Sequence, residues 1–161
     1  MLTARPAGRA LWSYQIADAD GAPVATVELD RMKDTGVLRL GDVRFGFSSP
    51  GWRSRRVALT FEGVEVAAAE RNPGLFRIAY DIHIQAGLLG APEAVHLRME
   101  SSPANSRFRL RLGDRDLGEI RRRRLLSLDV QIDVSDALPL GVQAFLLALV
   151  VIEWRRSTRS A

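Results

Sequence analysis

The chain has 161 residues, of which 47% are hydrophobic and 26% are charged, a balance typical of one globular domain and not of a disordered chain. It has no cysteine, which excludes disulfides, thiolate nucleophiles and cysteine-ligated zinc. The net charge is +4, and Lys33 is the single lysine among 23 basic residues. Such a surplus of arginine suits anionic partners, but it is also what a GC-rich genome produces.

The N-terminus, MLTARPAGRA, has arginines but no apolar core of the kind that a secretory signal needs. We therefore expect residues 1–10 to form a loose tail of a single domain that covers residues 1–161. Without an export signal, the expected location is cytoplasmic, with a peripheral place at a membrane left open.

The segment from Trp12 to Val134 alternates between apolar and polar residues and has turn signals every 8–12 residues. In the clearest segment, Phe76–Ile84, the aromatic and isoleucine side chains share one face, while Asp81 and His83 share the other. This pattern predicts a mainly β fold. Other expected strands are Val24–Leu29, Phe108–Leu112 and Leu126–Val134, whereas Leu88–Met99 is open between loop, short helix and strand.

Three stretches read alike, as strand, glycine turn, strand, turn and strand. They begin at Tyr14, Val57 and Phe108. The match lies in the pattern and not in the identity of the residues, and it predicts a repeated antiparallel meander.

Between Asp136 and Glu153 run sixteen uncharged residues, ALPLGVQAFLLALVVI. As a helix they would span about 24 Å, which is less than the roughly 30 Å of a bilayer core, and Gln143 lies in their middle. A surface helix would need a polar face, but apolar residues cover every side of this one. We therefore expect a helix over about residues 137–156 that is buried inside a closed antiparallel β-barrel and does not span a membrane.

Together these features resemble the Tubby-like superfamily, which includes LURP-one-related proteins and phospholipid scramblases. The residues that carry the resemblance are LSLDVQIDVSDALPLGVQAFLLALVVIEWRR, from Leu126 onward, and strand–turn–strand units such as LRLGDRDLGEI, from Leu110. The resemblance implies a twelve-stranded barrel around a central helix, and a role in binding anionic phospholipid or in regulation at membranes.

The basic residues form clusters that could meet phosphate headgroups, or could simply be a solvated surface. All four arginines of the run 121–124 can point outward only in a bend, so we expect an exposed loop there. Nucleic acid is an unlikely partner, because only Trp52 lies beside an arginine group. The clusters are Arg53, Arg55 and Arg56; Arg121, Arg122, Arg123 and Arg124; and Arg155, Arg156 and Arg159.

Catalytic motifs are scarce, and we expect no cofactor. No phosphate-binding glycine loop or nucleophile elbow is present, and Asp18-Ala-Asp20-Gly21 is better explained as a hairpin turn than as a calcium loop. If two strands pair in the right register, four side chains could converge on a metal, namely Asp81, His83, His96 and Glu100. Solvated polar residues are the plainer explanation.

The leading hypothesis is thus a non-enzymatic binding or regulatory domain that recognises anionic phospholipid headgroups or a protein partner. A metal- or acid/base-dependent hydrolase built on the four residues above is the alternative. A third is a structural or oligomerisation module, whose apolar contacts would come from Trp12, Trp52 and Trp154.

Overall fold

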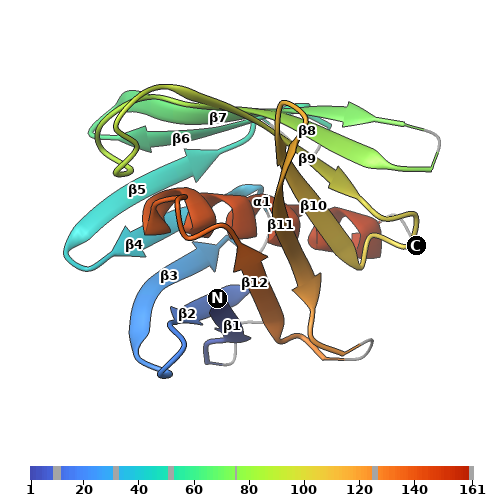
Figure 1. The fold of residues 1–161 in the computed structure, drawn as a ribbon, viewed down its shortest axis with the longest axis horizontal. Coiled ribbons are helices and arrows are strands. Elements are labelled where there is room, and N and C mark those ends of the chain that lie inside the picture. The colour runs from blue at the N-terminus through green and yellow to red at the C-terminus, as the bar shows by residue number, and fades with distance from the viewer. Residues whose placement is uncertain (9–11, 31–32, 51–52, 75, 125–126, 160–161) are drawn as a thin grey trace.

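The computed structural model describes residues 1–8, 12–30, 33–50, 53–74, 76–124 and 127–159. Its strands form one closed antiparallel barrel, and a C-terminal helix, α1 (Leu140–Arg159), runs through it (Figure 1). The strands are β1 (Leu2–Pro6), β2 (Ser13–Ala17), β3 (Pro23–Leu29), β4 (Thr35–Leu40), β5 (Val43–Ser48), β6 (Arg56–Phe61), β7 (Val64–Pro73), β8 (Ile78–Ile84), β9 (Val95–Ser101), β10 (Arg107–Leu112), β11 (Arg115–Arg122) and β12 (Val130–Val134).

Each strand pairs with its neighbours in the chain, and β1 closes the barrel by pairing with β12. Thr3 lies opposite Gln131 of β12 and opposite Ala17 of β2. The expected loose tail over residues 1–10 is therefore wrong for residues 2–6. These residues fill the gap between two strands whose edges would otherwise lack backbone partners.

The alternation of side chains explains the barrel wall. In β8, Tyr80, Ile82 and Ile84 are at most 2% exposed, whereas Asp81 points outward. The prediction that this strand begins at Phe76 is wrong, because β8 begins at Ile78 and the side chain of Phe76 is 78% exposed.

The three stretches that read alike each form a three-stranded meander, as predicted. They are β2–β4, β6–β8 and β10–β12, joined through β5 and β9. The undecided segment Leu88–Met99 is part loop and part strand, because β9 begins at Val95. The mainly β fold with a closed barrel is confirmed, and its twelve strands equal the number that the Tubby-like resemblance implies.

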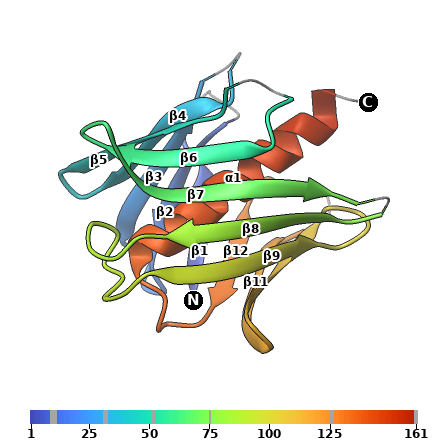
Figure 2. The ribbon, with the colours of Figure 1, turned by 90° about the horizontal axis from the view of Figure 1, so that it is seen from above.

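The helix occupies the lumen of the barrel, as predicted (Figure 2). From Ala144 to Ile152 every side chain is at most 1% exposed. The polar Gln143 is accommodated because its Nε2 donates a hydrogen bond of 2.8 Å to the carbonyl of Leu138, just before the helix. No helix among the described residues is long and apolar enough to cross a membrane.

The barrel has two ends, and the loops divide evenly between them. Loops that follow odd-numbered strands lie at the end where α1 terminates, because Trp154 contacts Asn105 of the β9–β10 loop and Arg155 contacts Asp34 of the β3–β4 loop. Backbone hydrogen bonds also connect these loops with one another or with the neighbouring strand ends. The amide of Leu29 donates to the carbonyl of Trp12, that of Ser49 to Asp34, that of Arg71 to Arg55 and that of Arg122 to Ser106. Loops that follow even-numbered strands lie at the opposite end, where α1 begins.

Candidate anion-binding site

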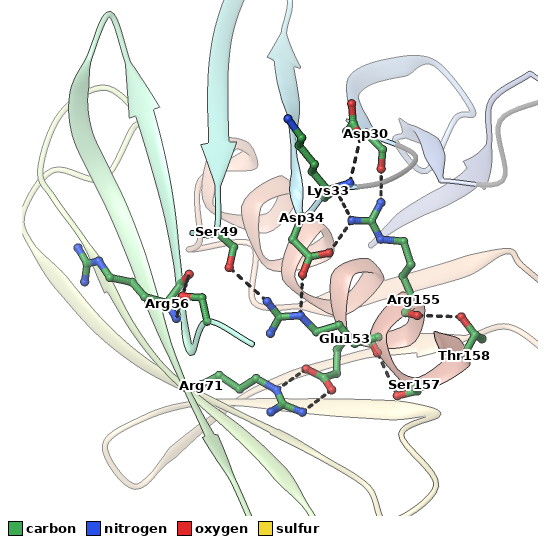
Figure 3. A network of polar contacts seen from close by, with 12 residues as sticks. Asp30, Lys33, Asp34, Ser49, Arg56, Arg71, Glu153, Arg155, Ser157 and Thr158 are labelled. Atoms are coloured by element: carbon green, nitrogen blue, oxygen red, sulfur yellow. Dashed lines mark hydrogen bonds and ion pairs between the residues drawn. The ribbon is translucent and has the colours of Figure 1, made fainter. Parts of the chain in front are cut away.

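The C-terminal part of α1 is held by a buried ion network in addition to its apolar contacts. Asp34, in the loop between β3 and β4, accepts a hydrogen bond of 2.5 Å from Arg155 and one of 2.9 Å from Arg156 (Figure 3). Arg155 also donates to the backbone carbonyls of Asp30 and Lys33. Burial disfavours the charge on Asp34, but the hydrogen bonds from the two arginines outweigh it and hold the pKa of Asp34 below its ordinary value.

A second buried ion pair joins α1 to the opposite wall. The guanidinium of Arg71 in β7 donates hydrogen bonds of 2.8 and 2.9 Å to the two oxygens of Glu153. The hydroxyl of Tyr80 donates a further bond of 2.8 Å to the same carboxylate. Burial of Tyr80, together with the nearby negative charge of Glu153, raises its pKa well above the ordinary value.

These contacts correct two expectations about the end of the chain. Arg155 and Arg156 belong to a buried network and not to a surface cluster, with exposures of 1% and 8%. Trp154 is only 4% exposed and donates from Nε1 to the carbonyl of Asn105 at 2.5 Å, so it offers no oligomerisation patch. Trp12 is half-buried, and Trp52 lies outside the described residues. The side chain of Arg159 is likewise outside the described set.

The first predicted arginine cluster lies on the surface at the same end of the barrel. Arg53 and Arg55 are exposed in the loop between β5 and β6, and Arg56 is the first residue of β6. The guanidinium of Arg56 forms an ion pair of 2.5 Å with Glu65 of β7. Arg56 is thereby partly neutralised, whereas Arg55 forms no ion pair with any described residue.

The run 121–124 is only partly the exposed bend that was expected. Arg121 and Arg122 are the last residues of β11 and half-buried, and Arg123 and Arg124 are exposed in the loop that follows. Arg122 points to the lumen side, where its guanidinium lies 4.5 Å from the ring centroid of Trp154. The exposed arginines of this run are therefore Arg123 and Arg124.

A pocket of about 500 Å³ lies on the outer wall, over β9, β10 and the loops at their ends. Its cationic lining comes mostly from β10, in which alternate residues face outward. Arg107, Arg109 and Arg111 contribute in this way, and Arg77 joins them from the loop before β8. Two serine hydroxyls of the β9–β10 loop, those of Ser102 and Ser106, lie 3.5 Å apart in the same lining.

Most of these guanidinium groups have no acid within ion-pair distance, although the charge of Glu100 interacts with Arg111 and Arg77 at longer range. Arg107 lies 3.4 Å from Glu119, but Arg77, Arg109 and Arg111 form no ion pair or side-chain hydrogen bond with the described residues. The acid in the lining, Glu100, is already engaged by Arg98 at 2.7 Å. This bond holds the pKa of Glu100 below its ordinary value and keeps it ionised. Three unpaired guanidinium groups and two hydroxyls make a site suited to a phosphate-bearing anion.

This pocket was not predicted from the sequence, although one of its features can be seen there. Arg-Phe-Arg-Leu-Arg, from Arg107, places three arginines on one face of a strand. Arg77 and Ser102 come from other loops, and only the pairing of β8, β9 and β10 brings them near this face.

The four candidate metal ligands do not converge. His83 and His96 lie opposite each other on β8 and β9, with 3.0 Å between Nδ1 and Nε2. Asp81 and Glu100 instead pair with the guanidinium of Arg98, at 3.4 and 2.7 Å. Within the described ranges, no three such side chains gather as a metal site would require.

Comparison with known proteins adds no assignment: no protein-family model matches this sequence, and no curated protein matches it.

Proposed function

We propose that this chain is a non-enzymatic binding domain of the Tubby-like type that recognises anionic phospholipid headgroups at a membrane surface. The observation that carries the proposal is the outer pocket with its three unpaired guanidinium groups, those of Arg77, Arg109 and Arg111. The twelve-stranded barrel around an apolar helix agrees with the resemblance seen in the sequence. Because the helix fills the lumen, a ligand would bind on the outer surface of the barrel.

The chemistry suits a phosphate group, whose several oxygens can accept from guanidinium and hydroxyl donors at the same time. Guanidinium groups bind phosphate oxygens through paired N–H donors, and the hydroxyls of Ser102 and Ser106 can donate to further oxygens. The pocket is open to solvent and spans both strand and loop residues, so it can admit a headgroup that remains attached to a bilayer. Each cation near an anionic leaflet contributes about 1 kcal/mol of binding free energy.

The test is sedimentation of the purified chain with vesicles of phosphatidylcholine alone, or with phosphatidylserine or a phosphoinositide added. We expect binding that requires the anionic lipid and falls steeply with salt. Arg77→Ser/Arg109→Ser should weaken it by roughly 25-fold, since about 1 kcal/mol per cation is about fivefold.

The matched control is Arg39→Ser/Arg44→Ser, which removes two exposed arginines that face each other across β4 and β5. This variant loses the same charge and should bind within about threefold of the wild type. Equal binding to neutral and anionic vesicles would refute the proposal. Equal losses in the two double variants would refute the assignment of the pocket.

A further inference from the structure

The charges of the loops separate according to the end of the barrel. The six loops at the end where α1 begins cover residues 18–22, 41–42, 62–63, 85–94, 113–114 and 135–139. Each of them contains an acid, and none contains a lysine or an arginine. We call this the acidic end; its acids are Asp18, Asp20, Asp42, Glu62, Glu93, Asp114 and Asp136.

The opposite end, where α1 terminates, carries exposed cations in its loops. In the described parts of these loops they come from four different connections around the barrel mouth. We call this the basic end; its exposed cations are Lys33, Arg53, Arg55, Arg77, Arg123 and Arg124. The acids in the described parts of these loops are Asp30, Asp34 and Asp129. Asp34 is buried against Arg155 and Arg156, so two acids remain against the six exposed cations.

The charges at one end of the barrel are screened from those at the other end in solution. The 20 residues of α1 span about 30 Å, whereas the Debye length at physiological ionic strength is about 8 Å. The modest net charge of +4 therefore conceals two ends of opposite sign. The helix dipole is matched by this arrangement, because acids surround its N-terminus and cations its C-terminus.

Charge, and not apolar exposure, distinguishes the two ends. Phe76 and Leu128 project from loops of the basic end with exposures of 78% and 39%. The acidic end has comparable side chains, since Val64 is 60% exposed and Leu88 is 52% exposed. An anionic leaflet attracts the first end and repels the second, so of these four side chains Phe76 and Leu128 can approach its headgroups.

We infer that the barrel stands end-on at an anionic bilayer, with the basic end against the headgroups and the acidic end directed away. This inference rests on the proposed function and adds the orientation and the docking surface. Arg77 belongs both to the basic end and to the lining of the outer pocket. It thereby connects the docking surface with the headgroup site.

The experiment compares two triple variants that remove equal charge from opposite parts of the barrel. Arg55→Ser/Arg123→Ser/Arg124→Ser changes the basic end. Arg39→Ser/Arg44→Ser/Arg115→Ser changes exposed strand arginines next to the acidic end. Both are assayed by flotation with vesicles of phosphatidylcholine and phosphatidylserine, and thermal unfolding checks that both variants fold.

We expect the basic-end variant to bind about 100-fold more weakly than the wild type, and the other variant within about fivefold. Equal losses would overturn the orientation while leaving lipid binding intact. Wild-type indifference to anionic lipid would instead refute the proposed function itself. Salt-sensitive self-association without lipid, abolished by the basic-end variant, would assign the basic end to a second copy and overturn the inference.

Discussion

The guanidinium of Arg71 and the carboxylate of Glu153 form two hydrogen bonds inside the barrel, although 82 residues separate them in the chain. The pair fastens β7 to the C-terminal half of α1, and Tyr80 donates to the same carboxylate. Because Glu153 is 1% exposed, water cannot replace it as the acceptor for its partners.

Glu153→Leu should therefore destabilise the fold by about 3–5 kcal/mol, since it leaves a partly buried guanidinium and a buried hydroxyl without their acceptor. Glu153→Gln keeps an acceptor oxygen for Tyr80 and should cost less. The measurement is the free energy of unfolding in urea. A Glu153→Leu variant as stable as the wild type would show that the pair does not hold the helix.

Asp34 predicts a loss of stability in acid. Its pKa is lowered in the folded state, so its contribution is present above the ordinary value of 3.8 and disappears as the pH falls through the folded pKa. Asp34→Asn should destabilise the protein at pH 7, because Arg155 and Arg156 stay buried without a counter-charge. The stability of this variant should also decrease less steeply than that of the wild type as the pH falls below about 4.

The control for Asp34 is Glu100→Gln, which breaks an exposed pair with Arg98 and should cost at most about 1 kcal/mol. Thermal unfolding from pH 2 to 7 compares the two variants. If the stability of Asp34→Asn fell in acid as steeply as that of the wild type, other carboxylates would be responsible for the acid sensitivity.

The two tyrosines of the chain predict the behaviour in alkali. Burial raises the pKa of both Tyr14 and Tyr80 above the ordinary value of 10.0. The stability that the two tyrosines contribute is therefore fully present below pH 10. It falls as the pH rises further, because the unfolded chain releases its tyrosine protons first. Absorbance at the tyrosinate band should stay low at pH 10 and appear together with unfolding. Titration of either tyrosine near pH 10 in the folded protein would contradict this account.

Phe145 tests whether α1 belongs to the core. Its side chain is 0% exposed, so Phe145→Asp would bury an unpaired carboxylate and should prevent folding. Phe76→Asp places the same charge on a side chain that is 78% exposed and should leave the fold intact. Circular dichroism distinguishes the two. A folded Phe145→Asp variant that merely detaches from vesicles would make the helix an anchor after all.

The barrel and its helix could be predicted because both depend on local patterns. Alternation of apolar and polar residues in segments such as Val24–Leu29 predicts strands. A helix that is apolar on every face must be enclosed by the rest of the protein. The strand Leu2–Pro6 could not be predicted in this way. Its five residues carry little pattern of their own, and it forms because β2 and β12 offer two unpaired edges.

The candidate site was less predictable because its groups come from distant parts of the chain. A cluster of arginines in the sequence does not show which of them will find acids. Arg155 and Arg156 look like a surface patch until the β3–β4 loop brings Asp34 over them. Arg109 and Arg111 look unremarkable, yet they remain unpaired on the outer face of the barrel.

The most direct test of the account is to locate the face of the barrel that meets the bilayer. The chain has no cysteine, so one introduced cysteine can carry an environment-sensitive fluorophore at a single site. Phe76→Cys and Leu128→Cys report on the basic end, and Asp42→Cys and Val64→Cys on the acidic end. With phosphatidylserine vesicles, we predict a blue shift of emission at positions 76 and 128 and no change at positions 42 and 64. A shift at position 42 or 64, or no shift at any of the four while the protein floats with the vesicles, would contradict end-on binding.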